Sequence, residues 1–173
     1  MITVFTSNFN SISQRFYDDL ISGIQLHQLK CPCCRHSGFM SYYGRYKRHV
    51  YIEGGKPCIY IQRVRCSCGH THALLPSSIV PYSRVLLWAQ VFLAINGSGL
   101  IAVTKLMNAG VNIDERTARY IWRNYILKWK QRLSSYLISL SDIPSLISGC
   151  FRCVSRQFMQ NKRTPNILFL SST

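Results

Sequence analysis

The sequence Cys31-Pro32-Cys33-Cys34 opens a segment of the chain that closes with Cys66-Ser67-Cys68-Gly69-His70-Thr71-His72. Between these two ends, residues 39–52 and residues 58–65 are rich in amino acids that favour strands. They are separated by Glu53-Gly54-Gly55-Lys56-Pro57, which is a turn signal. The pattern predicts a β-hairpin that brings the two cysteine-rich ends together in space.

Thiols gathered in this way are typical ligands of zinc. The first pair of cysteines has C-x2-C spacing, and the second has the tighter C-x-C spacing, with two histidines close behind it. We predict a structural, tetrahedral zinc (Zn²⁺) site in a zinc ribbon, with one histidine as the favoured substitute for a cysteine. The predicted ligands are Cys31, Cys34, Cys66, Cys68 and, as that substitute, His72. The alternative is that the cysteines are buried thiols that only pack, but so dense a group of Cys and His argues against it.

The composition predicts a globular protein with an anionic partner. The chain has 173 residues, of which 47% are hydrophobic, and 21 Lys and Arg against 6 Asp and Glu give a net charge of +15. These cations are spread over the chain rather than gathered in a tail, and such a field attracts nucleic acid. The N-terminus has no basic region followed by an apolar run, and no stretch reaches the roughly 18 apolar residues of a membrane span. We therefore expect a cytoplasmic protein whose cysteines bind metal rather than form disulfides.

Basic and aromatic residues alternate along the predicted hairpin. Cations can neutralise phosphates and tyrosine rings can stack on bases, so this composition suits contact with nucleic acid. The candidate contact residues on the strands are Arg45, Lys47, Arg48, Arg63 and Arg65. The alternative is that the tyrosines are strand formers and the cations are a solvated face.

The pattern along the chain predicts an α+β protein with a small β-hairpin zinc ribbon followed by a mainly α helix-turn-helix bundle. Pro76 and Pro81 mark residues 73–82 as a linker. The predicted parts are an N-terminal helical lead with a helix from Ser11 to Leu26 (1–30), the zinc ribbon (31–75), the helix-turn-helix bundle (83–140) and a C-terminal helix with an apolar tail (141–173).

From residue 83 onward the hydrophobic period is 3.6, which predicts three helices. Their expected ranges are 83–97, 99–109 and 113–140. Gly110 is placed to end the second helix in a left-handed conformation, and Asn112 with Glu115 reads as a capping box for the third. A plain three-helix bundle with a cationic face is the alternative to a helix-turn-helix.

In the helix-turn-helix interpretation, the third helix is the recognition helix. Cations and one tyrosine recur along its first half, which is the part that enters a major groove, and further cations follow where the helix would meet phosphates. The candidate contact residues are Arg116, Arg119, Tyr120, Arg123 and Lys130.

The residues Arg63-Val64-Arg65-Cys66-Ser67-Cys68-Gly69 and Thr71-His72-Ala73-Leu74-Leu75-Pro76, followed by the helices, resemble uncharacterised proteins linked to bacterial mobile elements. Their layout is similar to the N-terminal DNA-binding part of insertion-sequence transposases, and the resemblance covers about residues 30–140. It implies DNA binding near a transposon or phage function. We expect double-stranded DNA as the nucleic-acid partner, with a transposition complex or another nucleoprotein as a further partner.

We expect the protein to be non-catalytic. Of its six acidic residues two look like helix caps, so a carboxylate metal site for phosphoryl transfer is not expected. One enzymatic alternative takes His70 and His72 as the two-histidine motif of single-strand nucleases, with Tyr120 or Tyr125 as nucleophile. Another alternative is an adaptor or inhibitor that binds a nucleoprotein complex. Cys150 and Cys153 form a further C-x2-C pair, which we assign to helix packing, with half of a metal site as the alternative.

Overall fold

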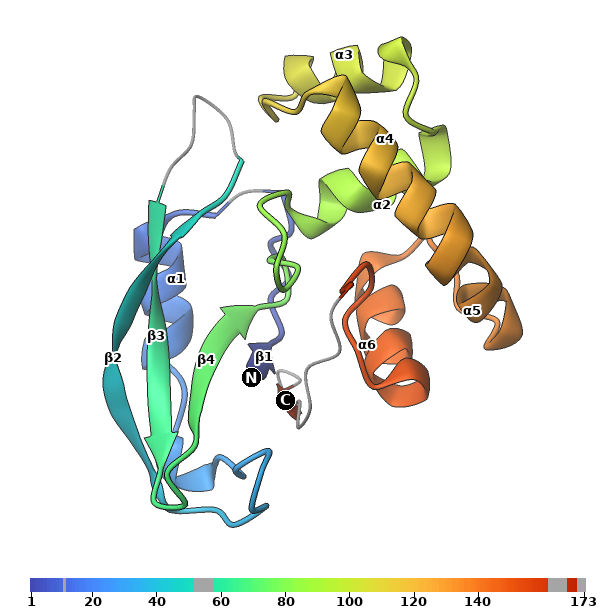
Figure 1. The fold of residues 1–173 in the computed structure, drawn as a ribbon. Helices are drawn as coiled ribbons and strands as arrows, with labels where there is room; N and C mark the ends of the chain where they lie inside the picture. Colours follow the sequence, from blue (N-terminus) through green and yellow to red (C-terminus); the bar gives the residue numbers. More distant parts are fainter. Residues whose placement is uncertain (11, 52–57, 162–167, 171–173) are drawn as a thin grey trace.

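The computed structural model describes residues 1–10, 12–51, 58–161 and 168–170 and shows a mixed α+β protein (Figure 1). A five-stranded sheet with the order β2-β3-β4-β1-β5 occupies one side. Its strands are β1 (Ile2–Val4), β2 (Met40–His49), β3 (Cys58–Cys66), β4 (Thr71–Pro76) and β5 (Leu168–Leu170). The predicted turn at residues 53–57 lies outside the described residues.

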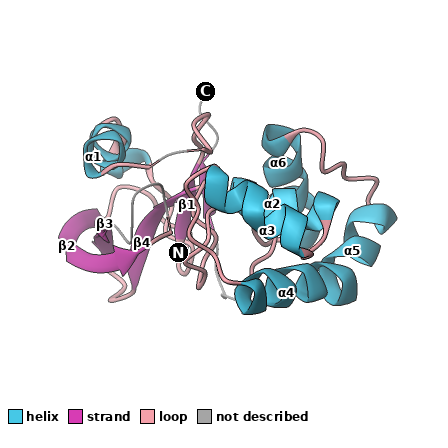
Figure 2. Ribbon diagram, turned by 90° about the horizontal axis from the view of Figure 1, so that it is seen from above, coloured by secondary structure: helices cyan, strands magenta, loops and turns pink. Residues whose placement is uncertain are grey.

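Most of the helices lie on the other side of the molecule (Figure 2). The described helical elements are α1 (Gln14–Ser22), a 3-10 turn (Leu26–Gln28), α2 (Leu87–Asn96), α3 (Leu100–Asn108), α4 (Glu115–Asn124), a π-helical turn (Tyr125–Trp129), α5 (Lys130–Ser135) and α6 (Ile143–Val154). Among the described residues, no helix has the length and apolar character needed to cross a membrane.

The predicted hairpin is present. Strands β2 and β3 pair antiparallel from Met40 opposite Cys66 to His49 opposite Cys58, with a bulge between Tyr42 and Gly44. The sheet extends beyond the hairpin, because β4 pairs antiparallel with β3 and β1 then runs parallel to both β4 and β5. The assignment of residues 73–76 to a linker is therefore wrong, since they belong to β4.

Helix α1 fills the opening where β3 and β4 diverge. Only residues Arg63 to Arg65 of β3 pair with β4. The amides of the earlier part of β3 that face β4 therefore have no strand partner there among the described residues. The Tyr60 amide donates to Gln14 Oε1 at 2.7 Å, and the Gln62 amide donates to the Tyr17 hydroxyl at 2.7 Å. The same Tyr17 hydroxyl donates to the Leu74 carbonyl at 3.0 Å, so this one side chain bridges the two strands.

Helix α1 is shorter than predicted. It begins after Ser13, whose side chain accepts from the Phe16 amide at 3.1 Å, and it ends at Ser22. The predicted cap Ser11 lies outside the described residues. A capping serine satisfies an amide that has no partner within the helix, which explains why the helix begins at this point.

Helix α3 ends as the sequence predicts. Gly110 has a φ of 80°, and the Gly110 and Val111 amides donate to the carbonyls of Met107 and Leu106 at 2.9 Å. This pair of bonds is a Schellman motif, which ends a helix with a residue in the left-handed conformation. The third helix is interrupted, because α4 passes through the π-helical turn into α5 and ends at Ser135 rather than near residue 140.

The predicted capping box at Asn112 is wrong. The cap of α4 is Asp114, whose carboxylate accepts from the Thr117 amide at 2.6 Å and from the Thr117 hydroxyl at 3.1 Å. The Thr117 amide bond lowers the pKa of Asp114. Asn112 and Asp114 are both residue types that can cap a helix, and the side chain that accepts the amide hydrogen bond at the start of α4 is that of Asp114.

Replacing Asp114 by alanine is expected to lower the melting temperature by a few degrees, while Asn112→Ala leaves it unchanged. Folding lowers the pKa of Asp114, so its stabilising contribution is present above the unfolded pKa and is lost as the pH falls through the folded pKa. Thermal melts of both variants at neutral and acidic pH measure this. Equal melting temperatures for Asp114→Ala and the parent protein at neutral pH would contradict the assignment.

Two hydrophobic cores lie on either side of the segment that joins the sheet to α2. One core packs the sheet with α1, the other packs the helices, and Trp88 contacts both. The joining segment is held in place, because Arg48 donates to the carbonyls of Val80 and Ser83 at 3.0 Å and the Tyr51 amide donates to the Arg84 carbonyl at 2.7 Å. The sheet and the helices are therefore linked by fixed hydrogen bonds.

Candidate metal centre and basic surface

Two tight turns present the cysteine side chains at one end of the hairpin. In the first, the Arg35 amide donates to the Cys31 carbonyl at 2.8 Å, and Arg35 itself has a φ of 64°. In the second, the Gly69 amide donates to the Cys66 carbonyl at 2.9 Å, with a Gly69 φ of 89°. Such turns direct neighbouring side chains and amides toward one point, which is how knuckles hold metal ions.

Four sulfur atoms meet between the turns. The Sγ atoms of Cys31, Cys34, Cys66 and Cys68 all lie within 4.8 Å of one another. Cys31 is 3.7 Å from Cys68, and Cys34 is 3.7 Å from Cys66. Zinc–sulfur bonds of about 2.3 Å in a tetrahedron give a sulfur–sulfur separation of about 3.8 Å. The cluster can therefore hold a metal ion.

The thiols of the cluster differ in how readily they ionise. Burial opposes ionisation of Cys31, but the Cys34 and Cys33 amides and the neighbouring thiols outweigh burial and lower its pKa to about 7. The His70 amide favours the Cys68 thiolate, but burial and the three other thiols raise its pKa to about 12. Metal ligands must be deprotonated, so metal binding would release protons from this cluster.

His72 lies behind the sulfur cluster rather than in it. Its side chain is buried, with Nε2 3.4 Å from Cys31 Sγ and Nδ1 3.1 Å from the Met1 main-chain nitrogen. Burial lowers the pKa of His72 to about 4, so its ring is neutral at physiological pH. A protonated Met1 amine donates to Nδ1, and in the matching tautomer the Nε2–H group faces the Cys31 sulfur. Cys31, Cys33 and His72 form a second group of possible ligands.

The two histidines of the nuclease alternative take different positions. His70 is exposed and has Nδ1 3.6 Å from Cys68 Sγ, whereas His72 is buried against Cys31. Among the residues that the structure describes, no group of possible metal ligands contains both histidines. The alternative with Tyr120 or Tyr125 as nucleophile therefore finds no shared metal site in this arrangement.

The candidate cations of the hairpin are not equally available to a partner. Arg48 is engaged with main-chain carbonyls, as described above, and Arg45 pairs with Asp18 at 3.2 Å. Arg63 and Arg65 both lie over the Tyr43 ring, with each guanidinium carbon 5.3 Å from its centroid. Lys47 and Arg65 are exposed. The hairpin thus presents a smaller cationic surface than its sequence suggests.

Helix α4 presents its candidate cations to solvent. Arg116, Arg119 and Arg123 are exposed, and Arg119 lies 3.9 Å from Glu115 in a loose ion pair. Tyr120 is 60% exposed, and its hydroxyl accepts from Asn161 Nδ2 at 2.9 Å. On the opposite side of the helix, Ala118 and Ile121 pack into the helical core. The basic face of α4 is therefore directed away from the core.

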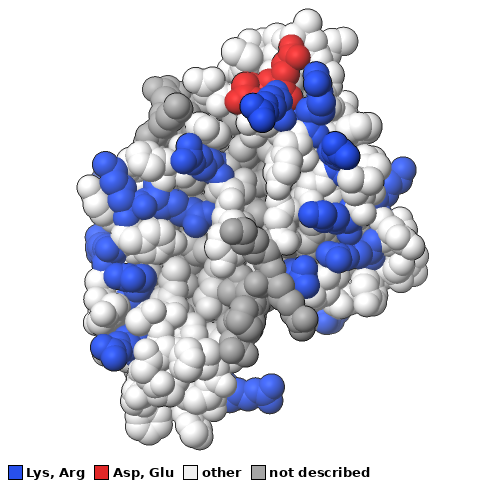
Figure 3. All heavy atoms as spheres, in the orientation of Figure 1, with Lys and Arg blue, Asp and Glu red and all other residues white. Residues whose placement is uncertain are grey.

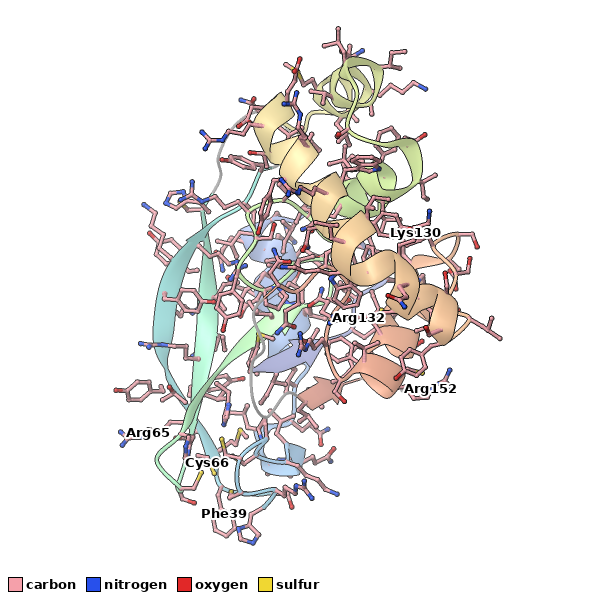
Figure 4. The ribbon with its side chains drawn as sticks, turned by 45° about the vertical axis from the view of Figure 1, so that its right-hand side comes forward. Phe39, Arg65, Cys66, Lys130, Arg132 and Arg152 are labelled. Carbon is pink, nitrogen blue, oxygen red and sulfur yellow. The ribbon has the colours of Figure 1, made fainter. Side chains whose placement is uncertain are left out.

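One face of the molecule combines cations from the sheet and from the helices. In Figure 3, Lys and Arg lie over the hairpin on the left and over the helices on the right, and acidic side chains gather at the top. Figure 4 shows Arg65 and Cys66 beside Phe39 at the lower end of the sheet, with Lys130 and Arg132 on the helical side. Lys130 is exposed, and the Arg132 guanidinium lies 5.7 Å from the Trp129 ring centroid.

The contacts of His72 were not foreseen from the sequence, because the Met1 nitrogen is remote in the chain and reaches it only through the parallel pairing of β1 with β4. His72 is buried on β4 between the exposed Thr71 and the partly buried Ala73, and the sequence Thr71–Pro76 has no apolar/polar alternation that could have placed it inside.

Residues 31–95 match a family described as "Domain of unknown function (DUF6431)", a range that includes both cysteine pairs and most of α2. Comparison with curated proteins and with solved structures gives no match.

Proposed function

We propose that this protein is a non-catalytic DNA-binding protein in which a structural zinc ion fixes the end of the hairpin. The observation that carries the DNA-binding proposal is the exposed basic face of α4, with Arg116, Arg119 and Arg123 directed away from the core. The net charge of +15 and the cations on the neighbouring sheet support the same partner. Helix α3, the turn that follows it and α4 would form the helix-turn-helix, with α4 in the major groove.

Zinc is the metal that this donor set favours. Soft thiolate ligands in a tetrahedral arrangement select zinc or iron–sulfur clusters, and four protein ligands leave no open position for a substrate. His72 would support the site by donating to the Cys31 sulfur, as ligands commonly receive hydrogen bonds from a surrounding shell. The ion would lock two turns that the chain otherwise holds by a few main-chain bonds.

Cys68 and His72 are the two candidates for the fourth zinc ligand, and substituting one or the other is expected to give different results. Cys68→Ser should abolish stoichiometric zinc binding, because it removes one of the four clustered sulfurs. His72→Gln should retain one zinc per chain with an affinity roughly 10- to 100-fold weaker. Zinc content and competition with a chelator measure both. Retention of zinc by Cys68→Ser together with its loss from His72→Gln would assign the fourth position to His72.

The proposed function is tested by titrating the metal-quantified protein with labelled duplex DNA, single-stranded DNA and RNA. We expect about one zinc per chain. If the protein contacts six or more phosphates, its affinity for the duplex should fall about 10³-fold or more between 50 and 200 mM salt. Binding with no preference for the duplex over the other probes, or binding that salt does not weaken, would contradict the proposal. Cleavage of the single-stranded probe would contradict the non-catalytic assignment.

The resemblance to mobile-element proteins adds a biological setting to the proposal. Residues 63–76 carry that resemblance, and they include the second cysteine pair and β4. We propose that the DNA partner belongs to a transposon or phage-like element and that this protein is an accessory or regulatory factor of it.

An adaptor that binds another protein is the second candidate function. Leu100 and Ile101, in the first turn of α3, are 68% and 77% exposed, and Leu127 is 66% exposed. Apolar side chains exposed to this degree favour contact with a protein partner. One zinc per chain without measurable nucleic-acid affinity would favour this candidate.

A further inference from the structure

A cavity of about 290 Å³ lies between helix α4 and the segment that joins the sheet to α2. Tyr82 and Arg84 line it from the joining segment, Tyr120 and Asn124 line it from α4, and Met159 also lines it. None of these residues belongs to the sulfur cluster. The cavity adjoins the basic face of α4, because Tyr120 belongs to both.

An unpaired polar group lies on a residue that lines this cavity. Asn124 is 6% exposed, and its Oδ1 atom has no hydrogen-bond partner among the described residues. Asn161, which also lines the cavity, has an Oδ1 atom in the same condition. A buried carboxamide without its hydrogen bonds destabilises a folded protein, so such groups require an explanation. A ligand with hydrogen-bonding edges supplies one.

The remaining lining residues define the chemistry of that ligand. Tyr82 and Tyr120 are 62% and 60% exposed, so two solvent-exposed aromatic side chains line the cavity. Arg84 is exposed beside them and carries a full positive charge. Aromatic rings, a carboxamide and a guanidinium together suit a flat heterocycle that carries an anionic group.

The wall formed by the joining segment is fixed before any ligand binds. Gln90 Nε2 donates to the Val85 carbonyl at 2.7 Å and to the Ser83 hydroxyl at 3.0 Å. The Arg84 carbonyl accepts from the Tyr51 amide, and the Ser83 carbonyl accepts from Arg48. Small-molecule sites are usually formed in advance in this way.

We propose that this cavity binds a single unstacked nucleobase. Tyr82 and Tyr120 supply the rings for stacking, Asn124 supplies the amide for the edge of the base, and Arg84 supplies the charge for its phosphate. The inference deepens the proposed function and rests on it: the DNA that the protein prefers carries an unpaired base next to a duplex, with the duplex on α4 and the base in the cavity.

The first experiment uses the free ligand, so that its result is separate from duplex binding. The full-length zinc-loaded protein is titrated by calorimetry with the 5′-monophosphates of adenosine, guanosine, cytidine and thymidine. We expect saturable binding of at least one of them at up to millimolar concentration. Tyr82→Gly, which relieves the φ of 63° at this position, should weaken that binding about tenfold or more. Arg84→Ala should weaken binding of the monophosphate but not of the matching nucleoside.

Asn124→Leu tests the amide directly, and Tyr136→Ala is the matched control, since Tyr136 is a 52% exposed tyrosine that lies outside this cavity. Tyr136→Ala should bind the monophosphate as the parent does. Because Asn124→Leu replaces a buried side chain, the melting temperature of this variant must be measured to check that it folds. If Asn124→Leu does not fold, Tyr82→Gly, which changes an exposed position, still tests the proposal. Monophosphate binding that neither Tyr82→Gly nor Arg84→Ala weakens would overturn the assignment.

The second experiment compares a fully paired duplex with the same duplex carrying one unpaired base. We expect the parent protein to prefer the second probe and Tyr82→Gly to lose that preference while keeping its affinity for the paired duplex. Duplex binding with neither preference nor monophosphate binding would overturn the base site and leave the proposed function intact. Monophosphate binding without duplex affinity would overturn the proposed function and the duplex part of this inference, and would leave only the base site.

Discussion

Replacing Cys31 by serine is expected to remove the metal ion and to lower the stability of the protein more than any other substitution considered. Cys31 is 1% exposed, and its Sγ atom is 3.7 Å from Cys68 Sγ and 3.4 Å from His72 Nε2. Serine is a poor zinc ligand, so the site would lose one of four donors in its most enclosed position. A ligand at 1,000 times its Kd stabilises a fold by about 4 kcal/mol. For a chain of this length that corresponds to a loss of about 8–16 °C in melting temperature.

The measurement is zinc content together with thermal unfolding, for the variant and for the parent protein treated with a chelator. Cys153→Ser is the matched control, since Cys153 is a half-buried thiol on α6 outside the cluster. It should keep both the zinc and the melting temperature. If the chelator leaves the melting temperature of the parent unchanged, the metal contributes nothing to the fold and the structural assignment is wrong.

The triple variant Arg116→Ala, Arg119→Ala, Arg123→Ala is expected to lose about a hundredfold or more in affinity for duplex DNA. These side chains are exposed on the solvent side of α4, so their removal leaves the helical core intact. If all three contact phosphate, the slope of log affinity against log salt should also decrease by roughly 2.7, at about 0.9 for each contact. Titrations at several salt concentrations provide both quantities.

A control of equal charge separates this local effect from the general field of the protein. The variant Arg15→Ala, Lys30→Ala, Arg152→Ala removes three exposed cations from α1, from the residue before the first cysteine pair and from α6. It should lose much less affinity and keep most of the salt slope. Equal losses in the two variants would show that the charge acts as a whole, and α4 would then not be a recognition helix.

The hairpin and the gathering of the four cysteines could be predicted because they depend on local signals. Strand-forming residues, a turn signal and C-x2-C spacing all lie within residues 31–72 and agree with one another. The strands β1 and β5 were not predicted as parts of this sheet, because each has three residues and finds its partners far along the chain. Parallel pairing leaves no turn signal between the two strands that could reveal it.

The same contrast applies to the site. The positions of Cys31, Cys34, Cys66 and Cys68 follow from the hairpin register, whereas the position of His72 depends on β1 and on burial. Arg48 was assigned to a nucleic-acid surface on composition alone, and its bonds to Val80 and Ser83 could not be read from residues that are 32 and 35 positions away. The cavity beside Asn124 also has no sequence signature, because its walls come from four separate parts of the chain.

The way in which α1 covers β3 has a consequence for how the protein avoids self-association. The Tyr60 and Gln62 amides are bonded to side chains of α1 instead of to a neighbouring strand. These amides belong to a strand edge that is covered by a helix rather than paired with another strand. If α1 separates from the sheet, the edge becomes a template for pairing with an extended segment of another chain. Helix α1 thus shields this part of β3 from pairing with another chain.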